Sequence, residues 1–458
     1  MYLLRSRTKV APAPLRMMRL ILSILAAASP SFAQYHCTNM PGKTCSITVQ
    51  TEAADLGADI NAAIQACPES GCLIEVPPGN YRLNATVPAP CPVNPVYAAV
   101  CMDKPVRLHL GAGTYTAGVF SKVQQVIMLA AHGAVLEGDG PATIIQTTDA
   151  AIGVDIPSTG SGSILRNLTL KGACVLNGVH CNSTQIPAEG VNAGSAMDVT
   201  ITDVLVENWG NHGINTGGFS TGWRIARVTT QSNFNDGILL AQNSNHAAVD
   251  AVTAQYNGGN GIDINAAYAS ITNNISAENG YNNAGRGVDC WGILVASVAG
   301  TNVNADANVI TGNRVFNNYC HQVVIRAEDP AYHSSWNEIR GNNISGGANT
   351  RTYQNATGIV IDASIPNGGT IEGTLIADNV ITGMPNDGVL IGGGAGQGTQ
   401  RNNTIRHNRL LSNGQAGSGY GIELSSGSNT KLDQNTFVTN VTGKVKIGGS
   451  ASHTQLKE

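Results

Sequence analysis

The 458-residue sequence is poor in charged and aromatic side chains, and each shortage excludes a class of protein. Only 12% of the residues are charged and the formal net charge is −4, so neither nucleic acid nor an anionic membrane is indicated as a partner. Six phenylalanines against 54 glycines indicate a thin, aliphatic core. No apolar run after the N-terminal leader approaches the roughly 20 residues of a membrane-spanning helix, and no stretch of about ten residues keeps a helical period.

What is present instead is a repeat that runs from residue 164 to residue 437. In each unit an aliphatic residue is followed, three positions later, by a residue that recurs from unit to unit. In the last six units that residue is always asparagine: Asn274, Asn313, Asn342, Asn379, Asn408 and Asn435. Each unit then continues with a Gly–apolar–x–apolar segment, and the first three of these glycines, Gly213, Gly237 and Gly261, are 24 residues apart.

A period of this size with short alternating strands indicates a solenoid. Coils stacked roughly 4.8 Å apart place equivalent residues above one another, and a column of buried asparagine amides can satisfy its own hydrogen bonds. We therefore predict an all-β fold, a single-stranded right-handed parallel β-helix with an internal Asn ladder at one corner and coils at about 102–447. A valine stack is expected to continue the ladder toward the N-terminus. The Leu-x-x-Leu-x-Leu signature of leucine-rich repeats is missing.

Residues 1–33 have the features of an export signal. Arginines precede a short apolar core from Leu20 to Ala28, and Ser31-Phe32-Ala33 supplies a small-x-small cleavage pattern. The core is too short to span a bilayer. The prediction is a signal peptide at 1–33 and a β-helix domain at 34–458 that is secreted or periplasmic.

All ten cysteines lie after the predicted signal, and they form five neighbouring pairs. An even count in an exported chain favours disulfides, and the clustered Cys-x-x-Cys pairs of a zinc site are missing. The pair Cys290/Cys320 has the best support, because Gly292 and Gln322, two residues further on, fill equivalent slots of adjacent coils. The other predicted disulfides are Cys37/Cys45, Cys67/Cys72, Cys91/Cys101 and Cys174/Cys181.

Residues 54–83 carry a resemblance to a known family. Asp59 to Cys67 is expected to form a short helix, and the segment from Val76 to Tyr81 reads V-P-P-G-N-Y. This arrangement resembles the N-terminal cap of the pectate-lyase superfamily, especially its rhamnogalacturonase- and epimerase-type branch. Leu136-Glu137-Gly138-Asp139-Gly140 is similar to the glycine-rich turn that opens the first coils in that family. These motifs specify the fold and not the reaction.

The resemblance implies an active groove along the outer face of the sheet that the Gly–apolar–x–apolar strands form. Alternation sends the aliphatic residue after each glycine inward, and the outer face is then mostly small or apolar, so its polar members stand out. The candidate catalytic residues are Asp263, Arg326, Asp362 and His321. The candidate substrate-binding residues are Asn215, Asn265, Gln322, Glu328 and Trp291.

Two reactions fit this set of side chains. Hydrolysis needs a protonated and an ionised carboxyl group, about 6.5–9.5 Å apart for inversion, and Asp263 with Asp362 is the candidate pair. β-Elimination from a uronate needs a base and a cation for the carboxylate, for which Arg326 or His321 with acidic calcium ligands are candidates. The predicted function is a secreted carbohydrate-active enzyme that cleaves an acidic, pectin-like polysaccharide. No cofactor is assigned, and calcium is expected only for a lyase.

Missing motifs leave a non-catalytic function open. Of the polygalacturonase motifs only Asn211-His212-Gly213 is found, and His212 is interpreted as a corner residue. The Trp-Ile-Asp-His block of pectate lyases and the Tyr-Gly-Phe-Asp-Pro-His-Asp block of alginate epimerases are absent. The alternative is a periplasmic or surface β-helix that binds glycans, in which Arg326 and Asp362 form only a cross-strand ion pair. The oligomeric state is not predicted.

Overall fold

The structure is a computed structural model, and it describes residues 45–49, 55–83, 89–91, 97–118, 125–148, 151–182, 188–284, 289–298, 303–328, 330–363, 368–392 and 398–457. The chain divides into Met1–Gln34 and the compact unit Tyr35–Glu458, which contains all of these residues. The predicted signal peptide and Cys37 lie outside the described residues. Within them, no helix is long and apolar enough to cross a membrane.

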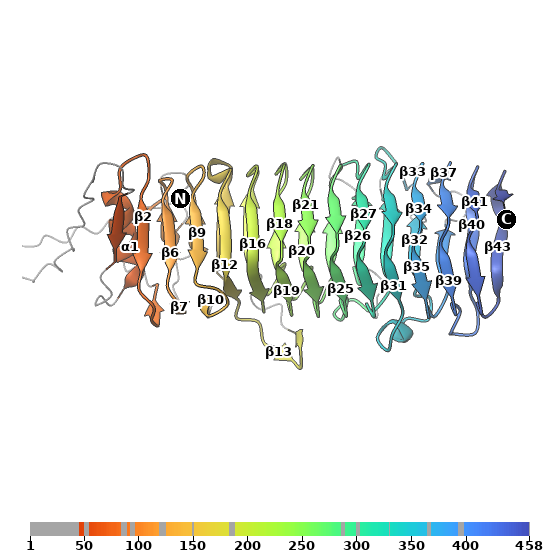
Figure 1. Cartoon of the computed structure of the whole chain (residues 1–458), viewed down its shortest axis with the longest axis horizontal. Helices are drawn as coiled ribbons and strands as arrows, with labels where there is room; N and C mark the ends of the chain where they lie inside the picture. The colour runs from red at the N-terminus through yellow and green to blue at the C-terminus, as the bar shows by residue number, and fades with distance from the viewer. Residues whose placement is uncertain are drawn as a thin grey trace, which may run out of the picture. The chain divides into compact units, whose positions relative to one another are not determined.

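The described residues form a right-handed parallel β-helix, as predicted (Figure 1). Two long parallel sheets run along it, one of 26 and one of 16 described strands. Most coils give two short strands to the larger sheet and one to the smaller, which we call the groove sheet. Equivalent residues face each other from coil to coil, as in Ile238 opposite Ile262 and Ile262 opposite Ile293.

The larger sheet comprises β1 (Ser46–Thr48), β2 (Leu73–Val76), β3 (Tyr81–Arg82), β6 (Arg107–Leu110), β7 (Gly113–Ala117), β9 (Val135–Gly138), β10 (Thr143–Thr147), β12 (Ile164–Lys171), β16 (Thr200–Glu207), β18 (Arg224–Ala226), β19 (Thr229–Gln231), β21 (Ala248–Asp250), β22 (Thr253–Gln255), β24 (Ser270–Thr272), β25 (Ile275–Ala277), β27 (Val309–Thr311), β28 (Arg314–Phe316), β30 (Glu338–Arg340), β31 (Asn343–Ser345), β34 (Leu375–Ala377), β35 (Val380–Thr382), β38 (Thr404–Arg406), β39 (Arg409–Leu411), β41 (Lys431–Asp433), β42 (Thr436–Val438) and β44 (Gln455–Lys457).

The groove sheet comprises β4 (Ala89–Pro90), β5 (Tyr97–Met102), β8 (Gln125–Leu129), β11 (Ile152–Pro157), β15 (Val191–Gly194), β17 (Ile214–Asn215), β20 (Ile238–Leu240), β23 (Ile262–Ile264), β26 (Ile293–Ser297), β29 (Val323–Ala327), β32 (Ile359–Asp362), β33 (Thr370–Glu372), β36 (Val389–Gly392), β37 (Thr399–Arg401), β40 (Tyr420–Ser428) and β43 (Gly443–Ser452). A small hairpin, β13 (Leu176–Asn177) with β14 (His180–Cys181), and two 3-10 turns, Ser158–Gly160 and Thr350–Thr352, complete the described elements.

The predicted N-terminal cap contains one helix, α1 (Leu56–Ala66). Its N-cap is Asp55, whose carboxylate accepts hydrogen bonds from the backbone N–H groups of Gly57 and Ala58. Such a cap satisfies donors that the first helical turn leaves free. The apolar face of α1, including Ile60 and Ile64, is fully buried, so the helix covers apolar side chains at the N-terminal end of the coils.

The corners between strands share one backbone conformation. The residue directly before each ladder position has a positive φ, for example 53° at Arg227, 55° at Asn273 and 67° at Gly312. A left-handed residue turns the chain sharply, at a cost of about 1–3 kcal/mol when it is not glycine. The next side chain then points inward, where it can bond to the adjacent coil.

The predicted Asn ladder is confirmed. Each asparagine from Asn274 to Asn408 donates from Nδ2 to Oδ1 of the next, over 2.9–3.0 Å, and the series ends at Asn435. The same Oδ1 atoms also accept backbone N–H groups, as Asn342 Oδ1 does from Asn313. At the N-terminal end the backbone N–H of Val252 donates to Asn274, so the valine stack joins the ladder directly.

The sequence prediction missed two further asparagine corners. A second ladder joins Asn233, Asn257, Asn279 and Asn318. At the third corner the backbone N–H of Asn308 donates to the side chain of Asn337. The second ladder had a visible signal, because its members stand five residues after the predicted column.

The core is the thin aliphatic column that the composition predicted. The residues expected to point inward, Ile214, Ile238, Ile262 and Ile293, are completely buried. They stack from coil to coil along the groove sheet, so each coil buries its aliphatic side chains against the next.

Four of the five predicted disulfides are confirmed: Cys67–Cys72, Cys91–Cys101, Cys174–Cys181 and Cys290–Cys320. The fifth prediction, Cys37/Cys45, is not confirmed. Cys45 is buried and disulfide-bonded, but its predicted partner Cys37 lies outside the described residues. The bonded state of Cys45 therefore agrees with the prediction, and its pairing with Cys37 stays a prediction.

Candidate active site

The outer face of the groove sheet carries two columns of side chains, which we together call the groove face. The first column holds the central outward residue of each strand, paired from coil to coil: Asp155, Asn192, Asn215, Leu239, Asp263, Leu294, Val324, Val360, Leu390 and Glu423. The second holds the residue before the glycine slot: Glu189, His212, Asp236, Asn260, Trp291, His321, Thr357, Asp387 and Tyr420. Arg326 and Asp362 lie directly opposite each other, two residues beyond the first column.

Several polar residues of the second column hold the neighbouring coil. Asp236 Oδ1 accepts the backbone N–H of Asn260 over 2.6 Å, and Asn260 Oδ1 accepts that of Trp291 over 3.1 Å. His321 Nδ1 and Asp387 Oδ1 accept the equivalent N–H groups of the coils that follow them. In each of these side chains one polar atom therefore bonds to the backbone of the next coil. Only the remaining polar atom can contact a ligand.

Asp263 has the most strongly perturbed environment on the groove face. Burial, together with the charges of Asp236 and Asp289, raises the pKa of its carboxyl group well above the usual range. The charge of Glu328 acts in the same direction. Amide groups of Asn260 and Asn265 donate to its two oxygens. The amide bond from Asn260 acts in the opposite direction, but burial comes first, so the pKa of this carboxyl group stays raised while two amides hold it in one orientation.

The predicted pairing of Asp263 with Asp362 is wrong. Asp263 lies opposite Leu294, and Asp362 lies three strand steps further on and two residues further along its strand. Three steps amount to about 14 Å. This exceeds the roughly 6.5–9.5 Å between the carboxyl groups of an inverting hydrolase. The carboxylates that influence Asp263 are Asp236, Asp289 and Glu328 instead.

A pocket of about 460 Å³, a size typical of small-ligand sites, lies on the C-terminal side of Asp263, which is not one of its lining residues. Its floor is aliphatic, from Val324, Val360 and Leu390. The full lining is Trp291, His321, Val324, Arg326, Tyr353, Asn355, Val360, Asp362, Asn386, Leu390, Gly392 and Ser425. Four predicted site residues, Trp291, His321, Arg326 and Asp362, are thus brought together.

Arg326 lies between two carboxylates and an aromatic ring. Its Nε is 3.3 Å from Asp362 Oδ2 and its Nη1 is 3.4 Å from Glu328 Oε1. Its guanidinium carbon lies 5.1 Å from the ring centroid of Trp291, within the range of a cation–π contact. Glu328, predicted to bind substrate, therefore binds the arginine.

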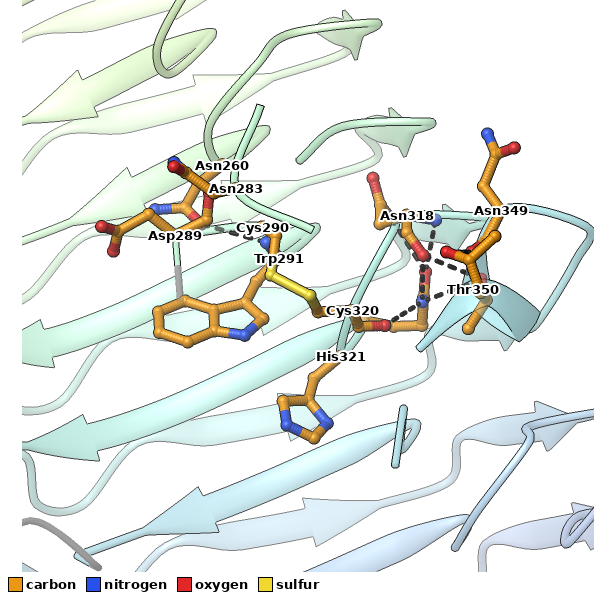
Figure 2. Close-up of a disulfide and its surroundings, with 12 residues drawn as sticks. Asn260, Asn283, Asp289, Cys290, Trp291, Asn318, Cys320, His321, Asn349 and Thr350 are labelled. Atoms are coloured by element: carbon orange, nitrogen blue, oxygen red, sulfur yellow. Dashed lines mark hydrogen bonds between the residues drawn. A yellow bond between two sulfur atoms is a disulfide. The ribbon is translucent and has the colours of Figure 1, made fainter. Parts of the chain in front are cut away.

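The Cys290–Cys320 disulfide joins the coils that carry Trp291 and His321, with a Cα–Cα distance of 5.4 Å. The indole and the imidazole extend to the same side of the backbone (Figure 2). Among the described residues, the buried indole N–H of Trp291 has no acceptor.

His321 is a neutral imidazole. Its burial lowers the pKa to about 4, and Arg326 acts in the same direction against the opposing charge of Asp362. Because Nδ1 accepts the backbone N–H of Thr357, the ring proton must be on Nε2. A ring in this state donates a hydrogen bond and has no free lone pair on Nε2 for a proton. This state does not match the general base considered for elimination.

The other predicted substrate-binding residues have scaffold contacts. Gln322 is completely buried and caps the second ladder through its Oε1, 2.8 Å from Asn318 Nδ2, so the prediction that it contacts substrate is wrong. Gln322 stands where other coils have glycine, and its side chain is long enough to reach Asn318 from this position. Asn265 is buried and orients Asp263, while Asn215 lies on the groove face and donates to Glu189.

A second polar group lies further toward the N-terminus of the groove. His212 Nδ1 is 3.1 Å from Asp236 Oδ2, and both side chains are buried. Burial alone would lower the pKa of His212, but the hydrogen bond and charge of Asp236 and the charge of Glu189 raise it. Burial also raises the pKa of Glu189 and of Asp155. His212 is a corner residue, as predicted, with an ionic partner.

Some of the site residues that the prediction missed had a partial signal in the sequence. Asp236 and Asp387 share the glycine-preceding position with His321 and Trp291, so the column was visible. Tyr353 lies in an irregular loop where no repeat marks a position. In the described part of the chain, no group of three or more His, Cys, Asp or Glu side chains has the arrangement of a metal site.

Comparisons with known proteins support the fold. No model of a protein family matches the chain, and no curated protein matches its sequence. Among solved structures, the A-module of mannuronan C-5 epimerase AlgE4 from Azotobacter vinelandii matches with a TM-score of 0.57 and 18% identity, over 88% of this chain and 97% of that one. The catalytic domain of a GH87 α-1,3-glucanase matches with a TM-score of 0.56 and 14% identity, over 92% and 69%. The Dettilon tailspike protein matches with a TM-score of 0.53 and 14% identity, over 83% and 68%.

The chain shares the parallel β-helix fold of these structures. The fold that the resemblance to the pectate-lyase superfamily implied is confirmed. Sequence identities this low show a shared fold and nothing about the reaction. A reaction has to be inferred from the residues of the groove. The disulfides are typical of an oxidising compartment outside the cytoplasm.

Proposed function

We propose that this protein is an exported enzyme that hydrolyses a glycosidic bond of a polysaccharide in the groove, with Asp263 as the general acid. The observation that carries the proposal is the Asp263 carboxyl group, which two amides hold one coil before Trp291 in the wall of a sugar-sized pocket and whose pKa burial raises. Environments that push the pKa values of neighbouring carboxyl groups apart are the mark of acid and base pairs.

In this reaction Asp263 gives its proton to the glycosidic oxygen as the bond from that oxygen to the anomeric carbon breaks. Water attacks the anomeric carbon and loses a proton to a carboxylate. We assign this base to Asp289, because it is exposed whereas Asp236 is buried and bound to His212. The sum is one water added across the bond.

The pocket supports sugar binding on the C-terminal side of Asp263. Aliphatic floor residues suit the C–H face of a pyranose ring, and Trp291 and Tyr353 supply aromatic walls. The Nε2–H group of His321 is the donor on this wall that we assign to sugar hydroxyls. Elimination has less support, because the neutral His321 is not placed to act as its base.

The test is product analysis on a panel of polysaccharides. We expect new reducing ends without the ultraviolet absorbance of an unsaturated uronate. Replacing the acid, Asp263→Asn, should lower kcat by about 10²–10⁴-fold with little change in binding. Leu239→Asn, at the position directly opposite Asp263 on the neighbouring strand, is the matched control and should keep its activity. Unsaturated products would contradict hydrolysis and show that the enzyme acts by elimination.

A second candidate is a non-catalytic glycan-binding module. It is favoured by the scaffold bonds of Asp236, His321 and Asp387, which give these polar groups a structural reason to be present. In that case glycan binding would persist in Asp263→Asn and Asp362→Asn, and no substrate of the panel would be cleaved by the unsubstituted protein.

A further inference from the structure

Acidic side chains outnumber basic ones on the groove face. Its acidic residues, with those at its rim, are Asp155, Glu189, Asp236, Asp263, Asp289, Glu328, Asp362, Asp387 and Glu423. Among the described residues of this face, the groups that can carry a positive charge near neutral pH are His212, Arg326 and Lys446. His321 is neutral there.

All three cations are already engaged. His212 is 3.1 Å from Asp236, and Arg326 is held between Asp362 and Glu328. At the C-terminal end Lys446 lies opposite Glu423 and bonds to it over 2.9 Å. A substrate carboxylate in the groove would therefore face carboxylates and find its cationic partners occupied.

The pocket itself has apolar surfaces where a charged substrate would need polar ones. Leu294, Val324 and Val360 form an outer apolar cluster with Trp291. Placing a carboxylate over such a surface removes its hydration without replacement. The uncharged C–H face of a neutral sugar loses nothing there.

We infer that the polymer bound in this groove is an uncharged polysaccharide and not a polyuronate. This inference rests on the proposed function and replaces the acidic, pectin-like substrate that the sequence suggested.

The test uses pairs of polymers that differ only in charge. Polygalacturonate, alginate and a glucuronan are each compared with their carboxyl-reduced forms, which keep the linkages and lose the charge, and a set of neutral glucans and galactans is added. Binding is measured on Asp263→Asn, with Asp289→Asn as a second blocked variant, and turnover on the unsubstituted protein. We expect at least one neutral polymer to bind at least tenfold more tightly than every uronate at low salt, and the difference to shrink as salt is raised.

Asp362→Asn supplies the charge control. It removes one of the two carboxylates on Arg326, so uronate affinity should rise several-fold while neutral affinity does not. A uronate polymer that binds as tightly as the neutral ones, or failure to bind any neutral polymer, overturns the inference. If a uronate is hydrolysed, the substrate class is wrong and the hydrolase stands. If a neutral polymer is bound and not cleaved, the hydrolase is wrong and the substrate class stands.

Discussion

Asp387 shows how a groove residue can be scaffold and titrating group at once. One carboxylate oxygen accepts the backbone N–H of Tyr420 over 2.6 Å, and the other is buried without a partner among the described residues. Burial raises the pKa of this carboxyl group to about 7. Asp236 and His321 hold neighbouring coils by the same kind of bond.

The raised pKa of Asp387 makes stability depend on pH. The folded protein holds a proton that the unfolded chain releases near 3.8, so this contribution to stability is present below about pH 4 and is lost as pH rises through about 7. Asp387→Asn keeps the acceptor and removes the cost of ionisation. We expect the variant to be more stable at pH 8, by up to about 3–4 kcal/mol, and nearly unchanged at pH 4. If Asp387→Asn and the unsubstituted protein had equal melting temperatures at both pH values, the prediction would be contradicted.

The protonation state of His321 can be observed directly. With a pKa of about 4 and Nδ1 bonded to Thr357, the ring should remain neutral with its proton on Nε2 throughout pH 5–8. Nitrogen chemical shifts of the labelled ring distinguish this tautomer from the alternatives. A ring that becomes protonated near pH 6.5 would contradict the assignment and restore His321 as a candidate base.

At the scale of the elements, the corners combine a strained residue with a buried amide. A left-handed residue such as Arg227 or Asn273 costs backbone energy at every turn. The asparagine that follows at position 274 offsets this cost, because its Nδ2 donates to Asn313 Oδ1 on the next coil and to the backbone C=O of Val249 on the preceding coil. Neighbouring amides of the ladder thus stabilise one another.

The valine stack gives a matched test of the ladder. Val252→Asn places a new amide directly before Asn274, whose Oδ1 already accepts the N–H of residue 252, so the ladder gains one member. Val228→Asn places the same amide between Val204 and Val252, where no side chain can accept from it. We expect Val228→Asn to be the more destabilising of the two, by about 1–3 kcal/mol in denaturant unfolding.

Removing a ladder member should also be costly. Asn342→Leu leaves the backbone N–H of Asn313 and one of its two side-chain N–H groups without an acceptor, and it takes one donor from Asn379. Each buried unsatisfied group costs about 1–3 kcal/mol. Leu239→Asn, on the outer face, should change the melting temperature little. Equal melting temperatures for Asn342→Leu and Leu239→Asn would contradict the register.

For the whole molecule, the repeat specified the fold and the face but not the site. Regular spacing placed Asp263, Arg326 and Asp362 outward and the isoleucines inward, because alternation needs only a count along the chain. Distances across coils depend on how many strands intervene. Three strand steps lie between Asp263 and Asp362, so the two residues are too far apart to act as a pair.

Two other features depended on local packing that the repeat does not encode. Gln322 occupies a glycine slot and turns inward because the second ladder offers it hydrogen bonds. Tyr353 comes from a loop without periodicity. The charges of Asp236 and Asp289 help to raise the pKa of Asp263. These two residues precede a glycine and a cysteine in turns, and the sequence analysis did not predict that they act on Asp263.

The role of Asp263 is tested most directly by a crystal structure of Asp263→Asn with a bound neutral oligosaccharide. We predict a pyranose ring stacked on Trp291 over the aliphatic floor, with a glycosidic oxygen about 2.6–3.2 Å from the new carboxamide. A chain bound to the larger sheet, or in the groove with every glycosidic oxygen far from residue 263, would contradict the assignment of Asp263 as the catalytic acid.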